Sequence, residues 1–268
     1  MLVEAIVLGI IQSLTEFLPV SSSGHLILFQ NILGWKAGGQ TFDVALHVGT
    51  FLALVIYFRK ELIDIAWGML VKSKKAERSF ERKLGLLLVV GTIPGVVSGY
   101  FLEDITATVF RSNFLVAVML MLGGLVLWAA DKLADISQKK KKLGDLRIAD
   151  SLTIGFSQAL ALVPGVSRSG ITISTGLFLG LDRENAARFS FLLSIPIVFG
   201  AAVKKFLTDG ASVIATDQIT FFVVGILTSA ITGYIVIKYF LNWLVRHGLM
   251  PFVYYRFVLA AVILIFLK

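Results

Sequence analysis

The chain has 268 residues, of which 57% are hydrophobic and only 16% are charged. Soluble domains are about 45–50% apolar and about one quarter charged, so this composition excludes an ordinary globular protein and indicates an integral membrane protein. The sequence has no cysteine, which excludes disulfides and a cysteine-ligated metal site. The net charge is +8, but the basic residues crowd into two short loops, so nucleic acid is not the expected partner.

The chain contains hydrophobic segments of two kinds, uninterrupted and interrupted. A helix needs roughly 20 apolar residues to cross a bilayer, and six segments are long enough, whereas two others are interrupted near the middle by LPVSSSG and VPGVSRSG. We expect each interrupted segment to form two short helices. In chain order there is an interrupted segment at 1–33, crossings at 41–58, 84–102 and 112–130, a second interrupted segment at 148–180, and crossings at 185–203, 218–241 and 251–267.

The two interrupted segments resemble each other, which predicts an internal repeat. When Gln12 is aligned with Gln158, ten of 27 positions are identical without a gap. Apolar composition alone would give about three or four identities. One further set of residues recurs with equal spacing in both halves: Gly91, Gly99 and Tyr100, and Gly225, Gly233 and Tyr234.

Charged loops predict the orientation of the chain in the membrane. Segment 59–83 contains eight Lys and Arg residues and segment 132–147 contains six, and short basic loops face the cytoplasm. The segments 103–111 and 204–217 mix acidic and basic residues and fit the outside better. Both termini are then expected outside.

This orientation predicts an inverted repeat, because 41–58 runs inward whereas 185–203 runs outward. The single membrane domain, 1–268, divides into a first repeat (1–131), a basic cytoplasmic linker (132–147) and a second repeat (148–268). The expected fold is an all-α polytopic membrane protein with two inverted-topology repeats, six full transmembrane helices and two re-entrant helix-turn-helix segments. If each interrupted segment instead crossed the membrane twice, the predicted orientation of the other segments would be the same. We prefer re-entrant hairpins because the half-helices have only about 12–18 residues and irregular backbone at membrane depth needs a protein or aqueous environment.

The first interruption carries several groups that could act on a substrate. Gln12 and Glu16 are four residues apart, on one face of a helix, and an ionisable group inside a membrane usually marks function, although a lone carboxylate near the interface is the simpler interpretation of Glu16. Ser21, Ser22 and Ser23 could cap the following helix. Because they stand beside His25 and a carboxylate, they also permit a nucleophile with a proton-handling partner. Both interpretations stay open here.

The second interruption contains Arg168 between Ser167 and Ser169. An arginine inside a membrane costs several kcal/mol unless a partner offsets it. A phosphate would do so, because the guanidinium fork matches its oxygens and nearby hydroxyls and helix amides add donors. The alternative is a structural ion pair with Glu16, and the two interpretations are compatible.

Several other polar residues are expected to have structural roles. His47 and His247 are interpreted as structural histidines. Trp243, Tyr254, Tyr255 and Arg256 are interpreted as anchors at the membrane interface.

Residues 12–25 (QSLTEFLPVSSSGH) and 164–172 (PGVSRSGIT) resemble the two signature stretches of the bacitracin-resistance family of bacterial undecaprenyl-diphosphate phosphatases, and the likeness extends over the whole chain. The resemblance implies a hydrolase of the bacterial inner membrane that removes the terminal phosphate of the C55 isoprenoid diphosphate and so recycles the carrier lipid of cell-wall glycans. It also implies a divalent metal, Mg²⁺ or Ca²⁺. The expected partners are this lipid substrate and membrane lipids, and homo-oligomerisation is left open.

The resemblance also assigns roles to residues. Glu16 matches the second acid of the Glu/Gln-x-x-x-Glu motif, and Gln12 stands at its variable first position. Both are candidate metal ligands. The other matched positions are Ser22 and His25, together with Ser167, Arg168, Ser169 and Thr172 of the phosphate-binding motif; Ser21 and Ser23 are grouped with the substrate-binding residues.

These assignments predict a mechanism. The two turns are expected to meet in the outer half of the bilayer, where Arg168, nearby hydroxyls and helix amides hold the diphosphate. Ser22 is the candidate nucleophile, His25 moves protons, and Glu16 with Gln12 holds the metal or orients the attacking group; a metal-bound water is the alternative attacker. The main rival function is a secondary transporter or translocase of an anionic lipid or solute, because inverted repeats with broken helices are also a transporter architecture.

Overall fold

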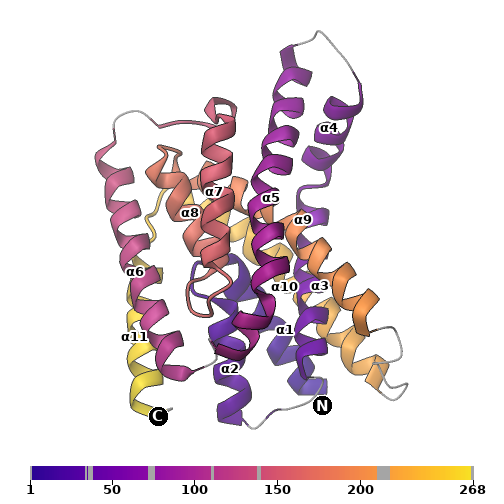
Figure 1. The fold of residues 1–268 in the computed structure, drawn as a ribbon, viewed down its shortest axis with the longest axis vertical. Coiled ribbons are helices and arrows are strands. Elements are labelled where there is room, and N and C mark those ends of the chain that lie inside the picture. Colours follow the sequence, from indigo (N-terminus) through magenta and orange to yellow (C-terminus); the bar gives the residue numbers. More distant parts are fainter. Residues whose placement is uncertain are drawn as a thin grey trace.

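The computed structural model describes residues 2–33, 35, 39–71, 76–109, 112–137, 140–209 and 218–266. This part of the chain is almost entirely helical (Figure 1). Its elements are α1 (Leu2–Phe17), α2 (Ser22–Leu33), α3 (Gly39–Tyr57), α4 (Arg59–Leu70), α5 (Ala76–Val109), α6 (Asn113–Ile136), the 3₁₀ turn η1 (Leu143–Asp145), α7 (Ile148–Leu160), α8 (Arg168–Phe178), α9 (Arg183–Asp209), α10 (Ile219–Leu244) and α11 (Met250–Phe266).

Both interrupted segments form two short helices, as predicted. The first turn, residues 18–21, separates α1 from α2, and the second turn, residues 161–167, separates α7 from α8. Each turn ends in a serine with a left-handed backbone: φ is 75° at Ser21 and 73° at Ser167. Positive φ is uncommon for residues other than glycine, and these two serines occupy equivalent positions in the repeat alignment. The two turns therefore share one unusual backbone conformation.

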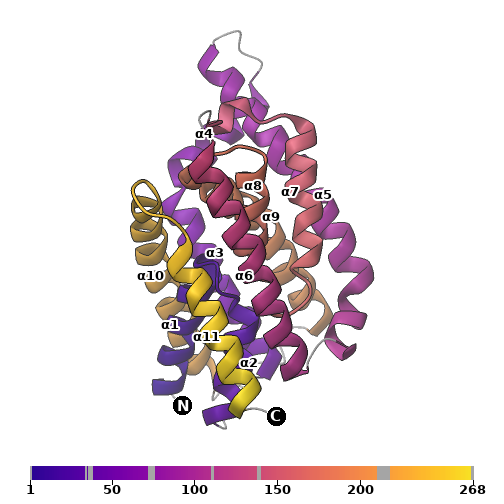
Figure 2. The same ribbon diagram turned by 90° about the vertical axis from the view of Figure 1, so that its left-hand side faces the viewer.

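Helices of the two halves are interleaved. Figure 1 shows both termini at one end of the molecule, and α4 with the beginning of α5 at the other. Helix α1 starts at the end that holds the termini, whereas α7 starts at the opposite end, so the two turns approach the middle from opposite sides (Figure 1). Figure 2 shows α6 and α11 side by side along the molecule.

Close helix contacts at glycines join the two halves reciprocally. A Cβ atom on Gly9 of α1 would lie 3.0 Å from the carbonyl oxygen of Gly225 in α10, and a Cβ on Gly155 of α7 would lie 3.0 Å from the carbonyl carbon of Gly91 in α5. Gly9 aligns with Gly155, and Gly91 recurs as Gly225. Glycine is required at these contacts because any side chain would separate the helices.

Large apolar side chains cover much of the outer surface, as expected for a protein in lipid. Four helices in the described part are long and apolar enough to cross a membrane: Ser79–Phe101 within α5, Asn113–Ile136, Arg183–Lys205 within α9, and Ile219–Leu244. Helix α3 meets this criterion only together with α4, across a 75° bend, and α11 has only 17 residues. The structure therefore supports four or five crossings by length and composition, and the number six stays a prediction.

The basic segment 59–83 was predicted to be a loop, but its described part is mostly helical. It contains α4 and the first turns of α5, which pack against each other: a Cβ on Gly68 would lie 2.9 Å from the backbone nitrogen of Arg82. The sequence prediction missed this hairpin because charged residues alternate with the apolar ones. Of the expected outer loops, 103–109 belongs to α5, whereas 110–111 and 210–217 lie outside the described residues.

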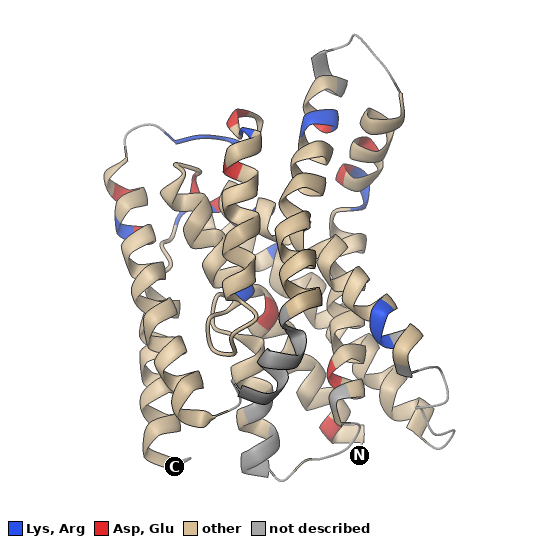
Figure 3. Ribbon diagram, in the orientation of Figure 1, with Lys and Arg blue, Asp and Glu red and all other residues tan. Residues whose placement is uncertain are grey.

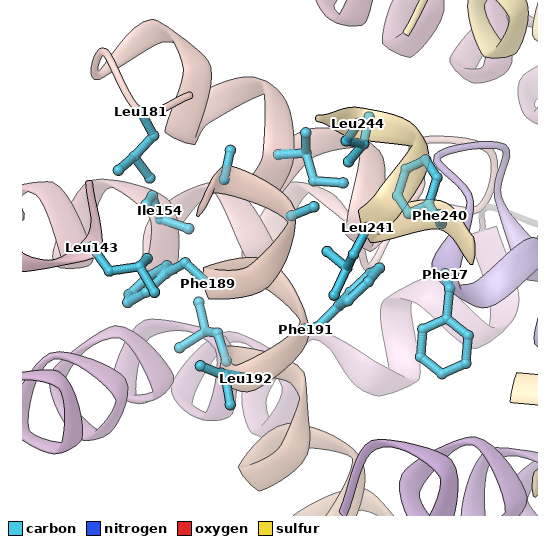
Figure 4. Close-up of a cluster of buried hydrophobic side chains, with 14 of the residues drawn as sticks. Phe17, Leu143, Ile154, Leu181, Phe189, Phe191, Leu192, Phe240, Leu241 and Leu244 are labelled. Carbon is cyan, nitrogen blue, oxygen red and sulfur yellow. The ribbon is translucent and has the colours of Figure 1, made fainter. Parts of the chain in front are cut away.

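The main hydrophobic core lies beside the first turn. Phe17, the last residue of α1, contacts Phe191 of α9 edge to face, with ring centroids 5.3 Å apart. Figure 4 shows both rings with Phe240 and Leu241 of α10 in one buried cluster. Because an aromatic anchor fixes the end of α1, the side chains one turn before it have a defined position.

Candidate active site

Glu16 is the centre of the site, because it binds residues from both turns. It lies on the buried face of α1, one helical turn after Gln12, and its side chain is only 8% exposed. The Ser22 hydroxyl donates a hydrogen bond to Glu16 Oε2 at 2.7 Å. Arg168 Nη2 lies 3.0 Å from the other oxygen, Oε1. The two turns therefore meet at one carboxylate. Figure 3 shows a basic and an acidic stretch of ribbon near each other in the middle of the molecule.

Arg168 is the first residue of α8, and the preceding turn holds it in place. The Ser167 hydroxyl accepts a hydrogen bond from Gly170 N at 3.1 Å, which caps the helix. Arg168 Nη1 also donates to the carbonyl oxygen of Ser190 in α9, at 3.3 Å. The structural ion pair with Glu16 that the sequence suggested as an alternative is present. The Arg168 side chain is 15% exposed, and its guanidinium can also bind an anion.

The remaining hydroxyl groups fix the two turns to their surroundings. Thr172 Oγ1 lies 2.6 Å from Ser190 Oγ and donates to the Arg168 carbonyl oxygen at 2.7 Å. Ser169 Oγ donates to the carbonyl oxygen of Leu18, in the other turn, at 3.2 Å. Equivalent serine pairs recur within each turn, with hydroxyl oxygens 3.3 Å apart in both: Ser21 with Ser23, and Ser167 with Ser169.

His25 is buried, and both of its ring nitrogens have partners. Nδ1 lies 2.7 Å from the carbonyl oxygen of Ser21, and Nε2 lies 2.7 Å from the Tyr255 hydroxyl. A carbonyl can only accept, so Nδ1 carries a hydrogen and Nε2 of the neutral ring accepts from Tyr255. In this arrangement His25 supports the backbone of the first turn, and it uses neither nitrogen to contact Ser22.

Arg256 was wrongly interpreted as an interfacial anchor. Its side chain is fully buried, and it binds backbone carbonyl oxygens of both turns. Nη2 lies 2.7 Å from the oxygens of Gly165 and Val166, Nη1 lies 3.3 Å from that of Pro19, and Nε lies 3.1 Å from that of Leu120 in α6. Arg256 also lies within a predicted crossing, so the cost of a charge inside a membrane indicates a buried partner for it as it does for Arg168.

His47 of α3, expected to be structural, lies beside Glu16. Its Nε2 is 3.6 Å from Glu16 Oε2, and its Nδ1 is 2.8 Å from the carbonyl oxygen of Asp43. No feature of the sequence around His47 predicts this contact, since the two residues come from separate helices. Among the described residues, no group of three or more His, Cys, Asp or Glu side chains forms a metal site. Gln12 and Glu16 thus bring a single carboxylate to the predicted metal position.

The fold and the site define a class: a polytopic helical membrane protein in which a carboxylate, a serine and an arginine meet where two broken helices approach each other. The family model described as "Bacitracin resistance protein BacA" matches residues 5–262. The chain belongs to this family, which confirms the resemblance recognised in the sequence.

Relatives named "Undecaprenyl-diphosphatase" match over almost their whole length. The protein from Desulforudis audaxviator is 44% identical over 263 residues, covering 98% of this chain and 96% of the relative. Those from Caldicellulosiruptor bescii and Alcanivorax borkumensis are 45% and 43% identical over 264 residues, covering 98% of this chain and 96% and 98% of the relatives.

Proposed function

We propose that the chain is an undecaprenyl-diphosphatase, a membrane hydrolase that removes the terminal phosphate of the C55 isoprenoid diphosphate and returns the carrier lipid to cell-wall glycan synthesis. Membership of the family and the names of the relatives support the substrate. The single observation that carries the proposal is the contact of Ser22 and Arg168 with opposite oxygens of Glu16. It joins a nucleophile, a base and an anion-binding group in one place.

Ser22 is the proposed nucleophile. Its oxygen attacks the terminal phosphorus, its proton passes to Glu16 Oε2, and the bond from this phosphorus to the bridging oxygen breaks. Undecaprenyl phosphate leaves, and water then hydrolyses the phosphoserine to release inorganic phosphate. The 2.7 Å hydrogen bond from Ser22 to Glu16 supports the proton transfer. Attack by a water molecule in place of Ser22 is the alternative.

Arg168 is proposed to hold the phosphate. Its fork can donate hydrogen bonds to two phosphate oxygens, and the amides at the start of α8 add donors. The hydroxyls of Ser21, Ser23, Ser167, Ser169 and Thr172 are proposed to contribute to substrate binding. His25 is proposed to handle protons after exchanging its hydrogen bond with Tyr255, and otherwise fixes the turn from which Ser22 projects. In phosphoryl transfer, such positioning and charge neutralisation supply most of the rate enhancement.

A divalent cation, Mg²⁺ or Ca²⁺, belongs to the proposal. One observation supports its fit: Gln12 Oε1 is buried and has no hydrogen-bond partner among the described residues, although it lies on the same helix face as Glu16. Nε2 is the amide atom that approaches Glu16, at 3.4 Å, and turning the amide by 180° brings Oε1 to that position. An amide oxygen and a carboxylate placed in this way suit a hard cation that takes its remaining ligands from water and substrate phosphate. When bound, the cation would neutralise charge on the phosphate oxygens.

The inverted repeat with six crossings and two re-entrant hairpins is proposed as the architecture. The matched φ angles of Ser21 and Ser167 support it, as do the reciprocal contacts of Gly9 with Gly225 and of Gly155 with Gly91. Both termini are proposed to lie on the outer side of the bacterial inner membrane. Figure 3 supports this orientation, because much of the described Lys and Arg lies at the end of the molecule away from the termini.

Phosphate release tests the function. Purified protein in detergent is expected to release inorganic phosphate from the isoprenoid diphosphate in the presence of Mg²⁺. The rival translocase predicts movement of the lipid across sealed liposomes without phosphate release, and that result would refute the proposal.

A further inference from the structure

We propose that His47 is a third ligand of the divalent cation, with Gln12 and Glu16, and that it makes the site of this chain prefer a first-row transition ion such as Mn²⁺ or Co²⁺ over Ca²⁺. The inference deepens the proposed function and rests on its cation. It adds a residue that the family motif does not contain, from a different helix, α3.

The imidazole of His47 is held with Nε2 available to a cation. Nδ1 lies 2.8 Å from the carbonyl oxygen of Asp43, one turn earlier in α3. The carbonyl only accepts, so Nδ1 carries the hydrogen, and the lone pair of the neutral ring is on Nε2. Metal-binding histidines almost always donate their second ring N–H in this way, because the hydrogen bond fixes the tautomer and the ring orientation.

Two acceptors face each other across a short gap in this arrangement. His47 Nε2 lies 3.6 Å from Glu16 Oε2, without a hydrogen bond between them. A lone pair and a carboxylate oxygen at this distance repel each other unless a positive charge lies between them. Metal bonds of about 2.1 Å place neighbouring ligand atoms about 3.0–3.4 Å apart, so a shift of a few tenths of an ångström lets one cation bind both. Arg168 occupies the opposite oxygen, Oε1. Ser22 donates to Oε2 at 2.7 Å, and this carboxylate oxygen has a second lone pair for a cation.

Gln12 supplies the independent observation. Its side chain is fully buried, and Oε1 has no hydrogen-bond partner among the described residues. Its Nε2 lies 3.4 Å from the same Glu16 oxygen that faces His47. A buried unpaired amide oxygen costs about 1–3 kcal/mol. Turning the amide by 180° exchanges Nε2 and Oε1, and Oε1 can then bind a cation held by Glu16 and His47.

The second repeat provides an internal contrast. Gln158, the equivalent of Gln12, also has a buried Oε1 without a hydrogen-bond partner in the described part of the chain. Leu162 stands at the position equivalent to Glu16, so this glutamine lacks the carboxylate. Its Nε2 donates instead to the Gly91 carbonyl oxygen at 3.4 Å. Only the first repeat combines the amide oxygen with a carboxylate and an imidazole.

The ligand set defines the class of cation. Ca²⁺ prefers six to eight oxygen ligands, and Mg²⁺ also prefers oxygen. An imidazole nitrogen raises affinity for first-row transition ions instead. The His47 side chain is 35% exposed, so water can complete the coordination shell.

The test measures Mn²⁺ binding to the purified full-length protein in detergent, with the metal alone, from the electron paramagnetic resonance signal of free Mn²⁺. His47→Gln and Gln12→Met are each expected to weaken binding by about tenfold or more. The matched controls, His247→Gln and Gln158→Met, are expected to bind Mn²⁺ as the wild type does. His47→Gln should also reduce the preference for Mn²⁺ over Ca²⁺ in competition. The visible spectrum of bound Co²⁺ should change in His47→Gln.

Two results would overturn the inference. Unchanged Mn²⁺ affinity and an unchanged Co²⁺ spectrum in His47→Gln would show that the histidine is not a ligand. Wild-type protein that binds no Mn²⁺ would also overturn it. Phosphate release, measured separately with Mg²⁺ on the wild type, tests the proposed function, so either idea can fail without the other. Gel filtration and thermal unfolding of each variant separate ligand loss from misfolding.

Discussion

The two turns both end in a left-handed serine but are followed by different side chains. Ser21 and Ser167 share a left-handed φ, 75° and 73°, and each turn contains a pair of hydroxyl oxygens 3.3 Å apart. The next residue is Ser22 in the first turn and Arg168 in the second, and both contact Glu16. Two turns with the same left-handed residue thus form one asymmetric site, in which one turn is followed by a hydroxyl and the other by a cation.

The differences extend beyond this one position. Glu16 and His25 of the first half are replaced by Leu162 and Ile171 in the second. The carboxylate and the imidazole of these two positions therefore come from the first half, whereas the second half contributes the positive charge of Arg168. We infer that the first turn carries the chemistry and the second turn holds the phosphate.

The largest effect is expected from Glu16→Gln, because Glu16 is where the two turns meet. An amide cannot take the Ser22 proton and does not attract the Arg168 guanidinium. We expect the rate of phosphate release to fall about 10³- to 10⁴-fold. Glu61→Gln is the matched control, since Glu61 also pairs with an arginine, Arg188, at 2.8 Å, but elsewhere. Equal losses in the two variants would contradict a special role for Glu16.

Arg168→Lys tests whether the second turn holds phosphate through the fork of arginine. Lysine keeps the charge but cannot bind two oxygens side by side. We expect kcat/KM to fall about 10²-fold, mostly through a higher KM. A change of this kind would separate phosphate binding by Arg168 from the attack by Ser22. Arg188→Lys is the control and should be nearly neutral. A loss confined to kcat in Arg168→Lys would contradict the division of labour between the turns.

Arg256→Met is expected to separate the two turns by leaving their carbonyl oxygens unpaired. Arg256 binds Pro19 in the first turn and both Gly165 and Val166 in the second. The buried carbonyls lose charge-assisted hydrogen bonds, so the free energy of unfolding should fall by at least about 3 kcal/mol. Thermal unfolding in detergent measures this, with exposed Arg246 as the control position. An unchanged Tm in Arg256→Met would show that the turns do not depend on it.

The smallest effect is expected from Tyr255→Phe, which removes the hydroxyl that binds His25 Nε2 at 2.7 Å. One hydrogen bond contributes about 1 kcal/mol, so phosphate release should change less than about tenfold. Tyr254→Phe, at the exposed neighbouring position, should be silent. Loss of activity as large as that of Glu16→Gln would mean that Tyr255 takes part in the reaction itself.

Local features predicted the elements and the main site residues. The prolines and serines at 18–24 and 163–170 predicted both helix breaks, and the cost of charge inside a membrane pointed to Glu16 and Arg168. Their ion pair was one of the interpretations that the sequence left open.

Contacts between distant segments could not be predicted. His47 and Glu16 meet only because α1 and α3 pack together, and Arg256 reaches turns that precede it by about 90 and 240 residues. The aromatic residues around Arg256 are typical of the membrane interface, and Arg256 was therefore interpreted as an anchor there. Its position within a crossing indicated instead that it needs a buried partner. The hairpin of α4 and α5 was missed because its amphipathic pattern lies in a strongly charged segment.

We propose that Ser22, which follows the first turn, attacks a phosphate held by Arg168, which follows the second turn. The most direct test is an acid-quenched reaction with substrate labelled on its terminal phosphate, followed by mass spectrometry of the peptide containing residues 18–24. We predict a phosphoserine at position 22 in the wild type, with neither label nor turnover in Ser22→Ala. Full turnover by Ser22→Ala, with no labelled serine in the wild type, would contradict the account.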